Sequence, residues 1–246
     1  MPVIELSIVI PVYNEEDVII PLMEEIAQVL GEDRERFEVI FVNDGSTDKT
    51  ELVLDKLRER YPVIRVISFV RNAGQSAAMI CGFRHARGKH VVSLDGDGQN
   101  DPGDIPRIVE LLEKYQVVCG IRARRQDSLA KRLGSKFARY VRQKVLGDSI
   151  TDVGCSLKGF HREVLQRLYF FDGAHRFIPI LLEMEGCSVG QVEVNHRPRT
   201  TGVSKYTNLG RLSKTWFDLI GVYWIGKRRL NYQIKHTLNG KDVSDG

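Results

Sequence analysis

Residues 90–101 read His90-Val91-Val92-Ser93-Leu94-Asp95-Gly96-Asp97-Gly98-Gln99-Asn100-Asp101, a hydrophobic run that leads directly into three carboxylates and two amides. The run has the pattern of a short buried β-strand. Alternation along an extended chain sends Asp95, Asp97 and Gln99 to one side. Hard oxygen ligands of this kind suit Mg²⁺ or Mn²⁺ rather than zinc. We therefore predict a divalent-cation site after this strand, with a solvated acidic turn as the competing interpretation.

The chain around this stretch alternates between strand and helix patterns. Short apolar runs predict β-strands over residues 6–10, 38–42, 63–69, 90–94 and 116–121. Helical patterns lie between and after them, over residues 21–30, 48–61, 74–86 and 104–115. This order implies βαβ units, so we predict an α/β fold with a mostly parallel, Rossmann-like twisted sheet flanked by helices. Ligands of such sheets bind beyond the carboxyl ends of the strands.

Three further segments follow predicted strand ends: Pro11-Val12-Tyr13-Asn14-Glu15-Glu16, Asn43-Asp44-Gly45-Ser46-Thr47-Asp48 and residues 71–78. An Asp-Gly-Ser sequence is by itself most often a β-turn. The chain contains no Gly-x-Gly-x-x-Gly motif and no phosphate-binding P-loop. A nucleotide would therefore have to be held by carboxylates and a metal ion.

The composition is that of a globular chain whose charge is unevenly distributed. Its 246 residues are 42% hydrophobic and 28% charged, which excludes disordered and fibrous proteins. Residues 1–100 hold 11 basic and 17 acidic residues, whereas residues 101–246 hold 25 and 15. The basic part implies an anionic partner or a solvated helix surface. Four cysteines without a Cys-x-x-Cys pair predict buried, reduced thiols.

Two segments of the basic part combine cations with apolar side chains. Residues 122–144 carry nine Lys or Arg against one acid, with an apolar stripe at helical spacing formed by Leu129, Leu133, Phe137 and Val141. Such a helix lies on anionic lipid or packs on the core with solvated cations. Residues 216–226 hold both tryptophans and precede Lys227-Arg228-Arg229, which favours an interfacial helix over a span. Aromatic residues are not interleaved with the cations, which argues against nucleic acid.

Together these segments resemble family-2 glycosyltransferases of the GT-A fold, and among them the polyisoprenyl-phosphate glycosyltransferases typified by dolichol-phosphate mannose synthase. The likeness covers roughly residues 4–210. It rests on Pro11-Val12-Tyr13-Asn14-Glu15, Asp44-Gly45-Ser46-Thr47-Asp48, Asn72-x-Gly74, Asp95-x-Asp97-x-Gln99, Gly120-x-Arg122 and Arg199-x-x-Gly202-x-Ser204-Lys205. The chain departs from the branch at residues 152–156, so the resemblance does not carry mannose specificity.

The resemblance implies roles for individual residues. Those around the base and ribose of a nucleotide-sugar are Pro11, Tyr13, Glu15 and Asp44. Those that hold Mg²⁺ or Mn²⁺ on the donor diphosphate are Asp95, Asp97 and Gln99. Those near the acceptor phosphate are Arg122, Ser135 and a basic position at Lys131 or Arg132. A mobile loop over the donor phosphates contains Arg199, Ser204 and Lys205, and Asp152 lies at the sugar end.

We expect an inverting, metal-dependent glycosyltransferase that moves a sugar from a UDP- or GDP-linked donor to undecaprenyl or dolichyl phosphate, for envelope glycan or lipid modification. Its catalytic residues would be Asp95, Asp97, Asp152 and Arg122. A phosphate acceptor has a second pKa of about 6 and is already ionised at neutral pH, so it needs no protein base.

Two alternatives stay open. A related transferase could use a saccharide hydroxyl as acceptor, with Asp152 as its base, or the chain could be a catalytically silent membrane-docking subunit. We expect a transferase domain over residues 1–210 and an amphipathic membrane-associating segment over residues 211–246. The N-terminus has no signal-peptide pattern. We therefore expect a cytoplasmic protein, peripheral on the cytoplasmic face of the inner membrane; its oligomeric state stays open.

Overall fold

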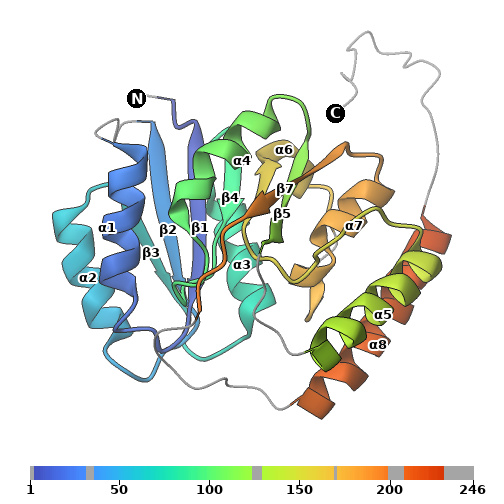
Figure 1. Ribbon diagram of the computed structural model, residues 1–246. Helices are drawn as coiled ribbons and strands as arrows, with labels where there is room; N and C mark the ends of the chain where they lie inside the picture. Colours follow the sequence, from blue (N-terminus) through green and yellow to red (C-terminus); the bar gives the residue numbers. More distant parts are fainter. Residues whose placement is uncertain (1–2, 32–35, 124–128, 169–170, 199–207, 230–246) are drawn as a thin grey trace, which may run out of the picture.

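A computed structural model describes residues 3–31, 36–123, 129–168, 171–198 and 208–229 (Figure 1). The strands are β1 (Leu6–Val12), β2 (Phe37–Asn43), β3 (Ile64–Ser68), β4 (His90–Ser93), β5 (Val117–Arg122), β6 (Lys158–His161) and β7 (Val189–Val194). The α-helices are α1 (Ile19–Leu30), α2 (Thr50–Arg60), α3 (Gln75–His85), α4 (Ile105–Leu112), α5 (Leu129–Leu146), α6 (Arg162–Leu165), α7 (Ile178–Met184) and α8 (Asn208–Arg228). Short 3₁₀ turns span Pro102–Asp104 and Ala174–Arg176.

These strands form one sheet in the order β3-β2-β1-β4-β6-β5-β7. The pairs β3–β2, β2–β1, β1–β4 and β5–β7 are parallel, whereas β6 runs antiparallel to both of its neighbours. The α/β class and the mostly parallel sheet are thus confirmed. The five predicted strands are present with shifted ends, but β6 and β7 were not predicted from the sequence, and β6 separates β4 from β5.

Helices cover both faces of the sheet because alternate strand residues point to opposite sides. On one face, α1, α2 and α4 pack on side chains such as Ile8 and Phe41. On the other face, α3, α6, α7 and α8 pack on side chains such as Val9 and Ile40. Gly82 of α3 lies so close to β1 that a Cβ atom there would be 2.2 Å from a Val9 methyl group. These layers leave the strand ends, and the turns that follow them, at the edge of the sheet (Figure 1).

Helices α5 and α8 pack side by side at one end of the molecule (Figure 1). Helix α8 buries Leu219 and Val222 and also packs on α7. Within the described residues, no helix combines the length and the apolar character that a membrane span needs. All four cysteines are free; three are buried as predicted, and Cys81 is half-buried.

His90 is a buried imidazole on β4. Its side chain is 5% exposed and faces His161 across the β4–β6 pair, with ring centroids 5.0 Å apart. Its Nε2 has no hydrogen-bond partner in the described part of the chain. Burial, aided by the charges of His161 and Lys89 and opposed by two nearby glutamates, lowers the pKa of His90.

We predict that His90 makes the protein less stable in acid. A histidine in the unfolded chain titrates near pH 6.5, whereas folded His90 resists protonation, so its contribution is complete above that pH and is lost as the pH falls toward the folded pKa. The urea midpoint should be lower at about pH 5.5 than at about pH 7.5, and His90→Phe should reduce this difference. An undiminished difference in His90→Phe would contradict the assignment.

Candidate functional site

The turns after β1 and β2 are held together by side-chain to backbone hydrogen bonds. The Asn14 N–H donates to Ser46 Oγ at 3.0 Å, and Asn14 Oδ1 accepts the Thr47 N–H at 2.8 Å. The Glu15 N–H donates to Thr50 Oγ1 at 3.0 Å. Asn14 adopts a left-handed φ of 54°, which asparagine tolerates better than most residues. This network places half-buried Tyr13 and Glu15 beside the turn after β2.

Sequence reasoning did not single out Asn14, although an asparagine in a tight turn was the available signal. Pro11 lies within β1, opposite Val42 of β2. Pro11, Tyr13 and Glu15 therefore share one strand end, as expected from the sequence. Their contacts with a nucleotide stay predictions.

Asp44 joins the turn after β2 to the start of α3. Its carboxylate is almost fully buried and accepts the Ala73 N–H at 2.6 Å and the Gly74 N–H at 2.9 Å. The next residue, Gly45, has a φ of +66°, and a Cβ atom there would lie 2.4 Å from the Arg71 carbonyl carbon. Only glycine fits this close approach of the two turns.

The acidic turn after β4 is fixed from several sides. Gln75 of α3 donates to Asp95 Oδ1 at 2.8 Å, and the Asp95 N–H donates to Asn100 Oδ1 at 3.2 Å. Asp97 Oδ1 accepts the Gln99 N–H at 3.2 Å. Burial, together with the Asp97 charge, raises the pKa of Asp95 despite the hydrogen bond from Gln75. A divalent cation would relieve this repulsion between the two half-buried carboxylates.

Asp101, the third carboxylate of the turn, has other partners. Its Oδ1 accepts the Gly103 N–H at 2.9 Å and lies 3.0 Å from Arg197 Nη2. Arg197 also binds Glu25 of α1 at 2.7 Å, and its backbone N–H donates to the Gln99 carbonyl at 2.8 Å. The Gln99 side-chain amide in turn donates to the Arg197 carbonyl at 3.3 Å. Arg197 and Gln75 are therefore structural parts of the site that sequence reasoning missed, because their partners are distant in sequence.

The side-chain oxygens of Asp95, Asp97 and Gln99 are hard ligands of the kind that a divalent cation bound to a diphosphate would need. Among the described residues, no group of three His, Cys, Asp or Glu side chains is arranged to hold a metal ion. Metal binding by Asp95, Asp97 and Gln99 stays a prediction, in which the protein would supply two carboxylates and one amide oxygen.

Arg122 and Asp152 form a bidentate ion pair at the end of β5. Arg122 Nε donates to Asp152 Oδ2 at 2.8 Å, and Nη2 donates to Oδ1 at 2.9 Å. The same carboxylate accepts the Arg122 N–H at 3.3 Å and the Gly154 N–H at 3.2 Å. Both side chains are mostly buried, with exposures of 17% and 11%. From the sequence we expected Arg122 near the acceptor phosphate and Asp152 at the sugar end, and we did not predict that the two side chains form a pair.

The segment over residues 152–156 connects this pair to the acidic turn. Ser156 Oγ donates to Asn100 Oδ1 at 2.7 Å, the oxygen that also accepts the Asp95 N–H. Ser93 Oγ donates to the Ser156 carbonyl at 2.6 Å. Buried Lys158 donates to the carbonyls of Val153 and Cys155 and fixes the middle of the segment.

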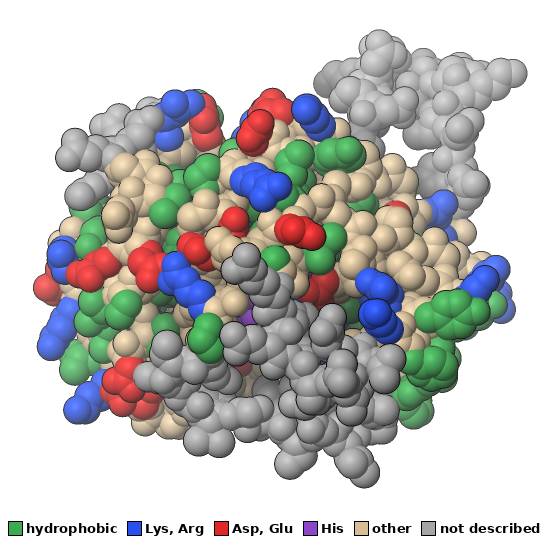
Figure 2. All heavy atoms as spheres, viewed as in Figure 1, with side chains coloured by type: hydrophobic (Ala, Val, Ile, Leu, Met, Phe, Trp, Pro, Cys, Tyr) green, Lys and Arg blue, Asp and Glu red, His purple; other side chains and the backbone are tan. Residues whose placement is uncertain are grey.

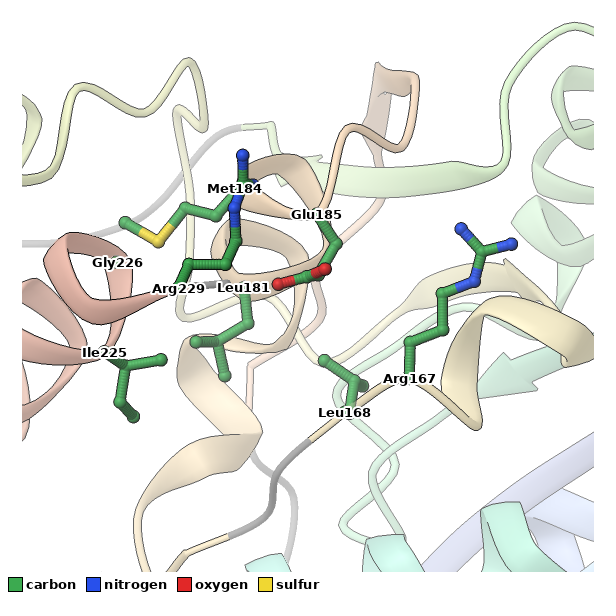
Figure 3. A pocket seen from close by; sticks show the side chains of 8 residues that line it. All are labelled: Arg167, Leu168, Leu181, Met184, Glu185, Ile225, Gly226 and Arg229. Carbon is green, nitrogen blue, oxygen red and sulfur yellow. The ribbon is translucent and has the colours of Figure 1, made fainter. Parts of the chain in front are cut away.

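Other predicted site residues are not brought into this cluster by the described contacts. Ser135 is exposed on α5, which packs against α8. Lys131 and Arg132 also belong to α5, but their side chains lie outside the described residues. Arg199, Ser204 and Lys205 lie outside the described residues altogether. A pocket between α7 and α8, lined by Leu181, Ile225 and the arginines 167 and 229 among others, contains none of the predicted residues (Figure 3).

The sequence matches known proteins over most of its length. Residues 7–169 match the family described as Glycosyl transferase family 2. Dodecaprenyl-phosphate galacturonate synthase of Rhizobium johnstonii is 36% identical over 225 residues, 89% of this chain and 66% of that protein. Undecaprenyl-phosphate 4-deoxy-4-formamido-L-arabinose transferase of Pseudomonas fluorescens is 38% identical over 222 residues, with shares of 89% and 65%. The chain thus spans just under two thirds of the length of these relatives.

Solved structures share the fold. Glucosyl-3-phosphoglycerate synthase from Mycobacterium tuberculosis, in complex with Mn²⁺ and UDP-glucose, has a TM-score of 0.64 at 22% identity, covering 90% of this chain and 78% of its own. The mannosyltransferase PcManGT from Pyrobaculum calidifontis, in complex with GDP-Man and Mn²⁺, has a TM-score of 0.60 at 21% identity, with shares of 81% and 58%. These similarities confirm the GT-A fold predicted from the sequence.

We predict that Gly45→Ala destabilises the protein more than Gly31→Ala. Both glycines have nearly the same positive φ, +66° and +68°, but no atom of the described residues lies within 4 Å of a Cβ at Gly31. The control substitution should cost about 1–2 kcal/mol of backbone strain, and Gly45→Ala about 1–3 kcal/mol more through the clash with Arg71. Urea unfolding of the two variants measures the difference. Equal losses would show that the two turns are not in close contact.

Proposed function

The chain belongs to glycosyl transferase family 2, and from this membership we propose that it transfers a sugar from a UDP- or GDP-linked donor to a polyisoprenyl phosphate, with inversion. The membership confirms the resemblance found in the sequence. The acceptor class is supported by the relatives, whose names specify dodecaprenyl and undecaprenyl phosphate. The product would be a lipid-phosphate-linked sugar for envelope glycan or lipid modification.

The observation that carries the proposal is the pairing of Asp152. A transferase with a hydroxyl acceptor needs a base that takes up a proton. Asp152 is the acid that the resemblance puts at the sugar end, yet its oxygens already accept two guanidinium and two backbone N–H groups. A carboxylate occupied in this way would have to give up a hydrogen-bond partner before it could take a proton from an acceptor hydroxyl. A phosphate acceptor is already ionised and removes the need for a base.

Arg122 is then the residue that receives the acceptor phosphate. The pair with Asp152 holds the guanidinium plane in one orientation, which favours bidentate recognition of phosphate oxygens. Ser135 and Lys131 or Arg132 of α5 would add to the acceptor side. Arg199, Ser204 and Lys205 would close over the donor.

On the donor side, Asp95, Asp97 and Gln99 would hold Mg²⁺ or Mn²⁺. The Mn²⁺ complexes of the related folds, with UDP-glucose and GDP-Man, support this assignment. A bound cation supplies charge that neutralises the departing nucleoside diphosphate. Pro11, Tyr13, Glu15 and Asp44 would surround the base and ribose of the donor.

Helices α5 and α8 present a surface suited to lipid. The exposed apolar side chains, here called the apolar face, are Phe137, Tyr140, Trp216, Phe217, Ile220, Tyr223 and Trp224. Those of α8 recur at helical spacing opposite buried Leu219 and Val222. Exposed Lys136, Lys144 and Lys227 flank this face, and Figure 2 shows hydrophobic side chains beside Lys and Arg there.

Large exposed apolar areas with cationic borders are typical of surfaces that bind anionic lipid. This surface supports the proposal that the protein is a peripheral membrane enzyme, which would act on the cytoplasmic face of the inner membrane. Residues 1–210 would form the transferase domain, and residues 211–246 would supply the membrane-associating segment.

We predict that the purified protein, given Mn²⁺, undecaprenyl phosphate and a panel of UDP- and GDP-sugars, forms a lipid-linked sugar with one donor. Asp97→Ala should lower the rate at least about 100-fold, because charge on the leaving group is no longer neutralised. Asp55→Ala, at an exposed position of α2, should leave it unchanged. Absence of lipid-linked product with every donor would refute the proposal. Transfer to a free saccharide instead would favour the hydroxyl-acceptor alternative.

We also predict that the protein floats with vesicles that contain anionic lipid. Binding should weaken with added salt, because cations contribute to it, and should fall strongly on combined Trp216→Ala and Trp224→Ala substitution. Leu52→Ala is the matched control, since Leu52 is an exposed apolar residue of α2. Flotation that is unaffected by the tryptophan changes would exclude α8 as the docking element.

A further inference from the structure

Ser76 and His175 form a part-buried polar contact that the proposed chemistry does not use. Ser76 Oγ lies 2.7 Å from His175 Nδ1 and accepts the Gly173 N–H at 3.0 Å. The Ser76 hydroxyl therefore links the His175 ring to the Gly173 backbone, whichever tautomer the imidazole adopts. The Ser76 residue is only 3% exposed, so it cannot reach a substrate as a nucleophile.

This contact lies at the first turn of α3, beside the residue that holds the acidic turn. Gln75 immediately precedes Ser76 and donates to Asp95 Oδ1 at 2.8 Å. A helical residue's side-chain direction depends on the position of its backbone. A contact that fixes Ser76 therefore also fixes where the Gln75 amide points.

The segment that carries His175 is itself held in place. Gly173 adopts a φ of +92°, and a Cβ atom there would lie 2.6 Å from a carboxylate oxygen of Asp218 on α8. On its other side, Asp172 lies near Gly74, with a carboxylate oxygen 3.8 Å from the Cβ position of that glycine. His175 thus belongs to a segment that lies between α8 and the first turn of α3.

We propose that His175 is a positioning residue for the acidic turn: through Ser76 it orients Gln75, and Gln75 in turn holds the Asp95 carboxylate in the arrangement that binds a metal-bound nucleotide. The proposal rests on the proposed function for the identity of this ligand. It assigns to His175 no contact with the substrate. We expect replacement of His175 to lower the affinity for this ligand, and to do so only when Gln75 is present.

The test is a double-mutant cycle in the affinity of Mn²⁺ with UDP and with GDP, measured by calorimetry on the full chain. His175→Ala and Gln75→Ala should each weaken binding of the nucleotide that the wild-type protein prefers by about 10-fold. Because both changes remove the same constraint on Asp95, the double variant should bind no more weakly than Gln75→Ala alone. His175→Asn, which can accept the Ser76 hydroxyl, should restore most of the affinity.

His85→Ala is the matched control, because His85 is an exposed histidine at the opposite end of α3 and should not affect binding. Additive losses in the double variant, or unchanged affinity in His175→Ala, would overturn the inference. If the wild-type protein binds neither nucleotide with Mn²⁺, the proposed function itself fails, so the two failures are distinguishable.

Discussion

The shape of the candidate site depends on the two hydrogen bonds that the Asp44 carboxylate accepts from the start of α3. This carboxylate is almost fully buried, and the N–H groups of Ala73 and Gly74 compensate for its loss of hydration. This contact joins the end of β2 to the start of α3. The first turn of α3 then directs Gln75 to Asp95 and Ser76 to His175. One buried acid therefore positions the acidic turn and the connection to α8, whatever part it also has in binding a nucleotide.

Ion pairs in the folded protein neutralise part of the positive charge that the sequence concentrates in residues 101–246. Several cations of the basic part are bound to acids: Arg122 pairs with Asp152, Arg142 with buried Asp148, and Arg197 with Glu25 and Asp101. Only part of the basic excess is therefore available to anionic partners. That part includes exposed cations of α5 and α8, beside the apolar face. An interfacial surface is consistent with this distribution, since its apolar and cationic groups occur together.

Hydrophobic periodicity was sufficient to predict the five strands with continuous apolar runs and the helices that follow them. It failed for β6 and β7 because neither has a continuous apolar run: β6 contains Lys158 and His161, and Gln191 and Glu193 interrupt β7. The acidic turn was recognised from residues close in sequence. Arg197 was missed because its partner Glu25 is 172 positions away. The same limit hid the Arg122–Asp152 pair, which joins residues 30 positions apart in separate segments.

The central claim is that the acceptor arrives already ionised and that Asp152 serves to orient Arg122 rather than to remove a proton. The most direct test is the rate of sugar transfer to undecaprenyl phosphate by Asp152→Asn, in which the side-chain oxygen can still accept a hydrogen bond from Arg122. Loss of a general base lowers rates by about 10²–10⁴-fold. The account predicts that Asp152→Asn keeps at least about a tenth of the wild-type rate, since no base is needed for a phosphate acceptor. A loss of about 100-fold or more, with acceptor binding unchanged, would contradict it.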